Sequence, residues 1–239
     1  MKNLAEQTLA SIVISNHHAA PILEKYQLDF CCKGKKTLKD ACIEKGLDHD
    51  SLSAELFAIE IPRQDTLPFN EMSLTALINY ILLNHHFYVK QTMPTISFYL
   101  QKIAAKHGER YPYMVEVKDL FEQIKSEMEL HLEKEESILF PRIKEIEASH
   151  QHILPDFPAI GYIAGPINMM EAEHEHAGMI MATIQSLTNH YTAPDDACTT
   201  FKVCIATLKE FEQDLHKHVH LENYILFPKS LALNLSIKN

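Results

Sequence analysis

Residues 131–141 read HLEKEESILFP, and residues 218–228 read HVHLENYILFP. Both stretches place a histidine four residues before a glutamate and end in the same ILFP tetrapeptide. The second copy begins 87 residues after the first (131 to 218), and no other obvious repeat occurs in the chain. A histidine and glutamate pair written twice predicts one site assembled from two equivalent halves.

Both copies lie on apolar seams with helical spacing. Around the first copy, steps of four and three residues connect Val117, Phe121, Ile124, Met128, His131, Glu135 and Ile138. The same steps connect Cys204, Leu208, Phe211, Leu215, His218, Glu222 and Ile225. Such positions face the core of a helix bundle. An ionised carboxylate in an apolar core costs several kcal/mol unless a partner compensates its charge, and a metal ion is the simplest partner.

Two further helical patterns also carry a histidine on the seam. One seam contains Ile163, Ile167, Met170, His174, Ala177, Met181 and Ile184. Shifted back by 88 residues, it falls on Leu82, His86, Val89, Met93 and Ile96. This register selects His86 over the neighbouring His85. Each of four helices therefore contributes one histidine to the predicted interior.

Four imidazoles and two carboxylates define the predicted site. Its residues are His86, His131, Glu135, His174, His218 and Glu222. One ion with six such ligands is an alternative, but two ions bridged by both carboxylates use every oxygen. Mixed imidazole and carboxylate ligation suits iron, manganese or zinc, and shared carboxylates favour iron.

Other histidines form a rival pattern. His216 and His220 lie four residues apart and could hold zinc on their own. They align with Glu129 and Glu133 of the first copy, which predicts that they lie on the polar outer face. His176 is no better a candidate ligand than these two.

Composition and periodicity predict an all-α fold. The chain has 239 residues, only 6 of them glycine, and long stretches of helix formers. Predicted helices cover residues 4–18, 37–45, 50–60, 73–106, 112–148, 166–190 and 195–231. The proline-containing stretch 60–70 predicts a linker. We therefore expect a small helical domain over residues 1–62 and an antiparallel four-helix bundle over residues 70–232.

Local signals refine these helices. Thr37, Asp50 and Ser73 are predicted N-caps, and Gly46 is a predicted helix stop. Asp195 and Asp196 suit a first helical turn, where the helix dipole favours negative charge. Prolines 94, 141 and 228 are expected to bend or end their helices. A looser connection is expected between residues 150 and 165.

The net charge and the spacing of the cysteines indicate which partners and which cellular location to expect. With 22 basic against 32 acidic residues, the formal net charge of −10 argues against nucleic acid or an anionic membrane as a partner. The chain contains no apolar run of 18 residues, so no membrane-spanning helix is predicted. The five cysteines lack disulfide-framework spacing, which predicts a reducing, cytoplasmic location.

On these residues, the bundle resembles the hemerythrin-like domain, and the whole chain is similar to the repair-of-iron-centres family of di-iron proteins. The similarity extends from about residue 5 to residue 230. Its motifs are YQLDFCCKGKKTL, HHFYVKQTMP, HLEKEESILFP, MEAEHEHAG and HVHLENYILFP. The resemblance implies two non-haem iron ions with an oxo or hydroxo bridge. It also implies four terminal histidine ligands and bridging roles for Glu135 and Glu222.

The resemblance further implies repair of iron-sulfur clusters damaged by nitric oxide or peroxide, through supply of iron. Damaged iron-sulfur proteins, small gas or peroxide ligands and an electron donor, whose identity the sequence leaves open, are the expected partners. Glu173, beside His174, matches an acidic family position and is expected to line the access path, with a solvated helix residue as the equal alternative. The alternatives are a di-iron nitric oxide or peroxide reductase and an oxygen, nitric oxide or iron sensor. A homodimer formed through the N-terminal module is compatible with its small size.

Cys31 and Cys32 form the second predicted functional feature. They are adjacent and are followed by three lysines within four residues. Positive charge nearby lowers the pKa of a thiol and raises its reactivity. We therefore expect a redox, nitrosylation or iron-transfer role, whereas burial of one or both side chains beneath the loop is the alternative.

Overall fold

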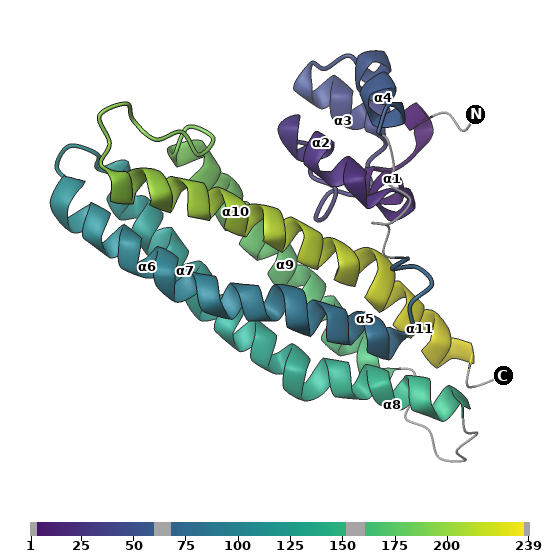
Figure 1. Ribbon diagram of the computed structural model, residues 1–239. Coiled ribbons are helices and arrows are strands. Elements are labelled where there is room, and N and C mark those ends of the chain that lie inside the picture. Colours follow the sequence, from purple (N-terminus) through teal and green to yellow (C-terminus); the bar gives the residue numbers. More distant parts are fainter. Residues whose placement is uncertain (1–3, 60–67, 152–160, 237–239) are drawn as a thin grey trace. The chain divides into compact units, whose positions relative to one another are not determined.

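The computed structural model describes residues 4–59, 68–151 and 161–236 (Figure 1). In this part of the chain every regular element is helical, apart from one isolated bridge between Thr8 and Thr37. The prediction of an all-α fold with a four-helix bundle is confirmed. Most of the predicted linker, residues 60–67, lies outside the described residues, as do residues 152–160 of the predicted looser connection.

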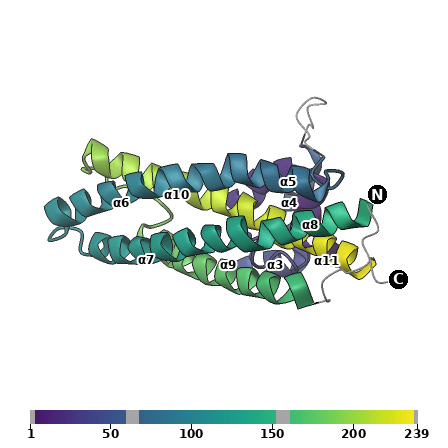
Figure 2. The ribbon, with the colours of Figure 1, turned by 90° about the horizontal axis from the view of Figure 1, so that it is seen from below.

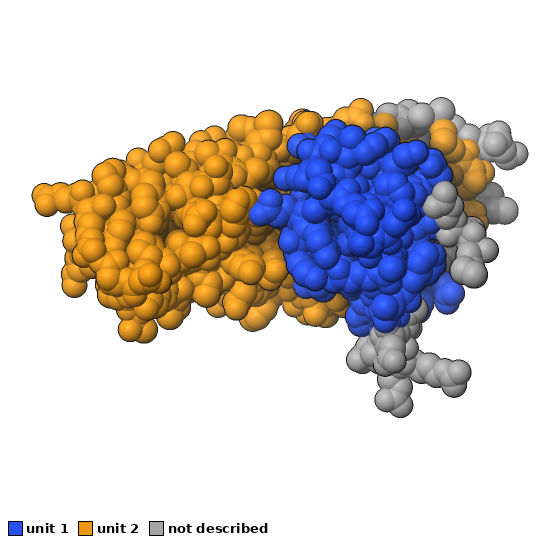
Figure 3. Space-filling view, turned by 90° about the horizontal axis from the view of Figure 1, so that it is seen from above, with its two compact units in different colours: residues 1–73, 216–229 blue, residues 74–215, 230–239 orange. Residues whose placement is uncertain are grey.

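The chain divides into two compact units, coloured separately in Figure 3. Residues 1–73 and 216–229 form one unit, and residues 74–215 and 230–239 form the other. The first unit therefore includes part of the last long helix. The predicted domain boundaries, 1–62 and 70–232, stay a prediction.

Short helices make up the N-terminal part of the first unit. They are η1 (Leu4–Glu6), α1 (Leu9–Ser15), η2 (His17–Ala19), α2 (Ala20–Lys25), α3 (Leu38–Lys45) and α4 (His49–Phe57). The single helix predicted over residues 4–18 is wrong, because α1 ends before Asn16. The Asn16 side chain accepts a hydrogen bond from the backbone N–H of His18 at 3.1 Å and starts a new turn.

The ends of α3 and α4 test the predicted caps. The Thr37 hydroxyl accepts a hydrogen bond from the Asp40 backbone N–H at 3.1 Å. Gly46 ends α3 with a φ of 64°, a left-handed conformation that glycine adopts without a Cβ clash. Both predictions are confirmed. The predicted cap Asp50 lies inside the first turn of α4, and Asp48 is the capping residue instead.

Four long helical segments form the bundle (Figures 1 and 2). The first comprises α5 (Leu74–Ile81), η3 (Leu82–His86) and α6 (Phe87–His107), and the second α7 (Tyr113–Lys134), η4 (Glu135–Leu139) and α8 (Phe140–Gln151). The third is α9 (Gly161–Leu187), and the last comprises α10 (Thr199–Leu221), η5 (Glu222–Leu226) and α11 (Phe227–Ser236). Among the described residues, no helix is both long and apolar enough to cross a membrane.

The elements η3, η4 and η5 are single turns of π-helix. In each, the N–H of the following phenylalanine donates to the carbonyl five residues earlier. These pairs are Phe87 with Leu82, Phe140 with Glu135 and Phe227 with Glu222. A π turn accommodates one extra residue without interrupting the helix. The helical segments continue past Pro141 and Pro228, which follow η4 and η5, and Pro94 lies inside α6.

The extra residue also changes which side chains face the core. Ile138, predicted on the seam, is 43% exposed, whereas Leu139 is 1% exposed. One residue turns an α-helix by roughly 100°. A π turn that begins at Glu135 therefore moves Leu139 into the inward position. In η5, Ile225 and Leu226 are both buried, since this turn also contacts α1 within the first unit.

The predicted boundaries of the later helices need correction. The helix predicted over residues 166–190 ends at Leu187, and Asn189, His190 and Tyr191 have positive φ angles. The last helix begins at Thr199 rather than at residue 195. Asp196 lies outside its first turn and accepts a hydrogen bond from the Tyr111 hydroxyl at 2.7 Å.

The N-terminus of α5 is capped from a distant helix. Both carboxylate oxygens of Glu147, in α8, accept hydrogen bonds from the backbone of α5. The Leu74 and Thr75 N–H groups donate at 2.7 Å and 2.8 Å. These contacts satisfy N–H groups that have no partner within their own helix. Ser73, the predicted cap, directly precedes the helix.

Candidate metal centre

Three of the six predicted ligand residues belong to the π turns. His86 is the last residue of η3, Glu135 is the first of η4 and Glu222 is the first of η5. His131 and His218 lie four residues before the two glutamates, in the last turns of α7 and α10. The sixth residue, His174, lies in α9. Local π geometry often occurs at functional sites, because it redirects side chains that an α-helix would place elsewhere.

All six side chains are buried. His86, His131, His174 and His218 are at most 3% exposed, and Glu135 and Glu222 are 0% exposed. Polar residues this deep in a helix bundle are uncommon unless they are paired or bind an ion. The structure therefore brings together the residues that the repeat selects.

The six residues form two overlapping clusters. One contains His86, Glu135, His218 and Glu222, and the other contains His131, Glu135, His174 and Glu222. Within each cluster, one candidate ligand atom from every residue lies within 4.8 Å of the others. Glu135 and Glu222 belong to both clusters, as carboxylates that bridge two ions would.

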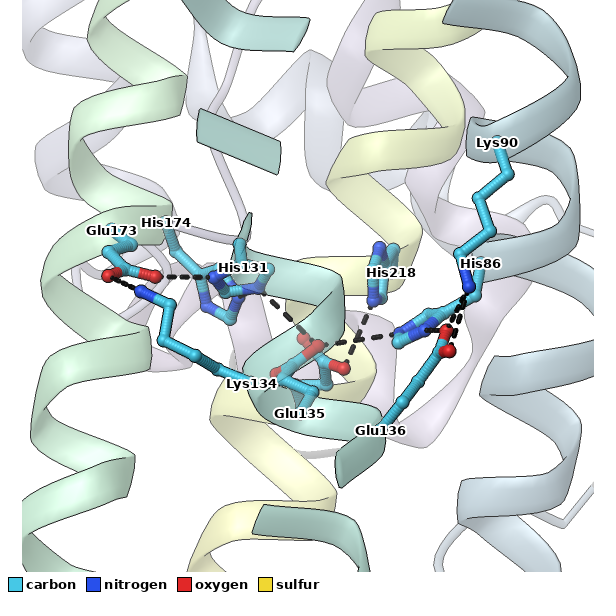
Figure 4. A network of polar contacts seen from close by, with 10 residues as sticks. His86, Lys90, His131, Lys134, Glu135, Glu136, Glu173, His174 and His218 are labelled. Atoms are coloured by element: carbon cyan, nitrogen blue, oxygen red, sulfur yellow. Dashed lines mark hydrogen bonds and ion pairs between the residues drawn. The ribbon is translucent and has the colours of Figure 1, made fainter. Parts of the chain in front are cut away.

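Individual distances show how the histidines point inward (Figure 4). The Nε2 atoms of His86 and His131 each lie 3.4 Å from Oε2 of Glu135. His174 Nε2 lies 3.1 Å from His131 Nε2, and His218 Nε2 lies 3.0 Å from Glu222 Oε1. Each histidine thus directs Nε2 toward another residue of the clusters.

The donor set fits a pair of first-row transition metal ions. Imidazole nitrogen and carboxylate oxygen are ligands that iron, manganese and zinc accept. Two carboxylates at 0% exposure also need a positive charge nearby, since the surrounding core is apolar. A metal would supply that charge and offer open coordination positions to small molecules.

Two further glutamates contact the outer nitrogens of the histidines. Glu173 Oε2 lies 2.8 Å from Nδ1 of His131, and its other oxygen accepts a hydrogen bond from Lys134. Burial raises the pKa of Glu173, but the hydrogen bonds from Lys134 and His131 outweigh it and leave this pKa below its usual value. Glu173 is therefore a direct partner of a candidate ligand, and its predicted access role stays a prediction.

Glu136 holds the equivalent position at His86. Its Oε1 lies 2.8 Å from His86 Nδ1 and accepts a hydrogen bond from Lys90 at 2.7 Å. Burial raises the pKa of Glu136, and hydrogen bonds from Lys90 and His86 lower it by more. Sequence reasoning missed this residue, because it lies one position off the seam.

Four further histidines, which the sequence offers as alternative ligands, differ in their surroundings. His85 is buried, and its Nδ1 lies 2.9 Å from Asp214 Oδ1. The prediction that His220 lies on a polar outer face is wrong, because it is 3% exposed and approaches the Phe30 carbonyl oxygen at 3.4 Å. His216 lies 3.6 Å from Glu24, and His176 lies 3.4 Å from Glu127. None of these four belongs to either cluster.

Cys31 and Cys32 lie in a turn of the first unit, beside Asp29. The two sulfur atoms are 3.7 Å apart, and Cys31 Sγ lies 3.2 Å from Asp29 Oδ1. The same oxygen accepts hydrogen bonds from both backbone N–H groups. Cys31 is buried and Cys32 is partly exposed.

The predicted lowering of the thiol pKa is wrong for Cys31. Its hydrogen bond with Cys32, its burial and the Asp29 charge hold the pKa of Cys31 well above its usual value. Among the neighbouring lysines, Lys36 pairs instead with Glu44 at 2.6 Å. The neighbouring Cys32 thiol, burial and the Asp29 carboxylate, and not the lysine run, determine the direction of this pKa shift.

A helix bundle with two overlapping histidine and carboxylate clusters defines a metal-binding protein of the hemerythrin type. Residues 77–230 match the family described as the hemerythrin HHE cation-binding domain. Residues 5–60 match a domain of unknown function, DUF542. The bundle match covers more than half of the chain and implies binding of non-haem iron.

Relatives in the genus Yersinia match almost the full length. The iron-sulfur cluster repair protein YtfE of Yersinia pseudotuberculosis serotype IB (strain PB1/+) is 33% identical over 225 residues. The match covers 94% of this chain and 96% of that protein. The protein of the same name from Yersinia pestis (strain Pestoides F) has the same identity and coverage. The chain belongs to the family of these hemerythrin-type cluster repair proteins, which confirms the resemblance seen in its motifs.

Proposed function

We propose that this protein restores iron-sulfur clusters damaged by nitrosative or oxidative stress, by supplying iron from a di-iron site. His86, His131, His174 and His218 would hold two non-haem iron ions, and Glu135 and Glu222 would bridge them. An oxo or hydroxo bridge would complete the pair. The observation that carries this proposal is that the same two buried carboxylates occur in both clusters.

The number of protein donors supports a role in iron supply. Six side chains shared between two ions leave each ion with few protein bonds, so the ions can exchange with an acceptor. Damaged iron-sulfur proteins are the proposed acceptors, in line with the name of the Yersinia relatives. An electron donor is the remaining proposed partner, and small gas or peroxide molecules are the proposed ligands of the open positions.

The cysteine pair supports a second element of the proposal. Two thiols 3.7 Å apart, one of them partly exposed, form a site that can receive iron or undergo redox change. We assign Cys31 and Cys32 to iron handover. All five cysteines are free, which supports a reducing, cytoplasmic location. The charge of −10 argues against nucleic acid and anionic membranes as partners.

The test combines two measurements on one sample. Protein loaded with isotopically labelled iron is mixed with an iron-sulfur enzyme that nitric oxide has inactivated. Recovery of the enzyme with label in its cluster is the expected result. Retention of the label together with steady consumption of nitric oxide or peroxide would instead identify a reductase. A Cys31→Ser, Cys32→Ser variant that transfers iron as fast as the parent would contradict the handover role.

A further inference from the structure

Two carboxylate braces cross between helices at the candidate centre. Glu136 directly follows Glu135, a candidate ligand of the second long helix, and contacts His86 of the first. Glu173 directly precedes His174, a candidate ligand of α9, and contacts His131 of α7. Each brace therefore adjoins a candidate ligand on its own helix and holds a histidine on another.

The braces determine which nitrogen of each histidine faces the clusters. Both contacts are made to Nδ1, at 2.8 Å, and both Nε2 atoms face Glu135 at 3.4 Å. A carboxylate accepts a hydrogen bond from Nδ1–H, so the lone pair of the neutral ring is on Nε2. This tautomer has its free lone pair on the nitrogen that faces the cluster.

Each of the two glutamates also accepts hydrogen bonds from a lysine, which lies on the same helical segment as the histidine that the glutamate contacts. Lys90 lies four residues after His86 and donates to both oxygens of Glu136 at 2.7 Å. Lys134 lies three residues after His131 and donates to Glu173. In Figure 4 the two glutamate and lysine pairs lie at opposite ends of the polar network. All four side chains are partly exposed, between 32% and 49%.

One brace serves each cluster. His86 belongs to the cluster that includes His218, and His131 belongs to the cluster that includes His174. The centre therefore has two equivalent supports, which act on different candidate ions. Supports of this kind orient a ligand ring and raise its basicity without touching the metal.

We infer that Glu136 and Glu173 are positioning residues, one for each iron, and that they set how firmly each ion is retained. This inference rests on the proposed iron site. Loss of one brace frees one imidazole to rotate. The binding of the ion that this imidazole holds is then weakened more than the binding of the other ion. Because both braces are partly exposed, a client protein that contacts one of them could weaken the retention of one ion without affecting the other.

The experiment compares Glu136→Ala, Glu173→Ala and the double variant as full-length, iron-loaded proteins. Ferrous iron is captured by a coloured chelator in excess, and Mössbauer spectra follow the two iron environments. Each single variant is expected to lose one of two irons about 10–100-fold faster than the parent protein. The double variant is expected to lose both irons fast.

Matched variants separate positioning from folding. Glu136→Gln and Glu173→Gln retain an oxygen acceptor for Nδ1–H, so they are expected to recover part of the retention. Lys90→Met and Lys134→Met leave the glutamates intact and should give smaller increases in the rate. Glu133→Ala removes an exposed glutamate of α7 and is expected to release iron like the parent. Circular dichroism confirms that each variant is folded.

The outcomes distinguish the two proposals. If the parent holds two irons and the alanine and glutamine variants all release them at the parent rate, the brace inference fails while the iron site stands. If each single variant loses both irons together, the assignment of one brace to each ion fails. If the parent binds no iron at its clusters, the proposed function fails and this inference fails with it.

Discussion

Glu135 and Glu222 are both fully buried, and one carboxylate oxygen of each lies within 4.8 Å of the other. Two like charges at this distance repel each other unless a cation lies between them. The same pair should therefore stabilise the iron-loaded protein and destabilise the metal-free protein. The contribution of this pair to the free energy of unfolding therefore changes sign when iron binds, which distinguishes a metal centre from an ordinary polar core.

Replacing one of these carboxylates should have opposite effects in the two states. Glu222→Gln is expected to raise the thermal stability of the metal-free protein, because it removes a repulsion of at least about 3 kcal/mol at an effective dielectric constant of about 20. The same variant should bind less iron and gain little stability from it. Calorimetry with and without iron measures both effects.

Glu210→Gln, at an exposed position of α10, provides the control and should change neither state. A metal-free Glu222→Gln protein that unfolds at a lower temperature than the metal-free parent would show that repulsion does not dominate.

Iron itself should stabilise the fold. Ligands that bind only the folded state add about 2.7 kcal/mol at a free concentration 100-fold above the dissociation constant. Removal of iron by a chelator should therefore lower the unfolding temperature, and added ferrous iron should restore it. His131→Ala should lose most of this gain, because the remaining ligands are left buried and uncompensated. Equal unfolding temperatures with and without iron would argue against a site inside the bundle.

Gly34 and Gly46 should tolerate alanine very differently. A Cβ at Gly34 would lie 2.2 Å from the Phe30 carbonyl oxygen and 2.8 Å from the Tyr224 ring. A Cβ at Gly46 meets nothing within 4 Å, and only its φ of 64° opposes the change. Gly46→Ala should cost about 1–2 kcal/mol, and Gly34→Ala clearly more, because backbone must move. Urea denaturation monitored by circular dichroism measures the two costs, and similar midpoints would refute this packing argument.

Glu147 should stabilise the bundle without affecting iron. Glu147→Ala removes both acceptors from the N-terminus of α5, and loss of a helix cap costs about 0.5–2 kcal/mol. Glu147→Gln retains one acceptor and should cost less. Iron content should equal that of the parent in both variants. An unchanged urea midpoint for the alanine variant would mean that water replaces the cap without cost.

Alkylation should reveal the raised pKa of Cys31. Only the thiolate reacts, so a raised pKa keeps Cys31 slow at about pH 7.5, and its rate should rise as the pH increases toward that pKa. Cys32→Ala removes the hydrogen bond that contributes most to the increase and should speed the reaction at Cys31. Peptide mass spectrometry measures each site, with exposed Cys198 as the internal reference. A Cys31 that reacts faster than Cys198 would contradict the raised pKa.

The sequence repeat predicted more of the centre than of its surroundings. The offset of 88 residues between two of the seams selects His86 over His85, and the structure places His86 in a cluster and His85 beside Asp214. A repeat of inward positions carries this information because each helix has one core face. Glu136 lies one residue off that face and reaches His86 through its long side chain, so periodicity alone could not identify it.

Two other errors have equally local causes. The predicted seam includes Ile138 because it assumes α-helical spacing throughout, and the extra residue of η4 moves Leu139 there instead. The repeat predicts a polar surface position for His220 because its counterpart, Glu133, is polar. In the first unit Phe30 covers it, and burial lowers the pKa of His220 to about 4. A pattern on one helix does not reveal what packs against its outer face.

The π turns have a mechanical consequence for the whole bundle. Glu135 and Glu222 each open a turn in which the regular hydrogen-bond ladder is replaced, and a proline without an N–H follows each turn after one further residue. Helices bend most easily at such places. Each of these two glutamates, the proposed bridges, is thus attached where its helix bends most easily, so filling or emptying the centre should change the tilt of α8 and α11.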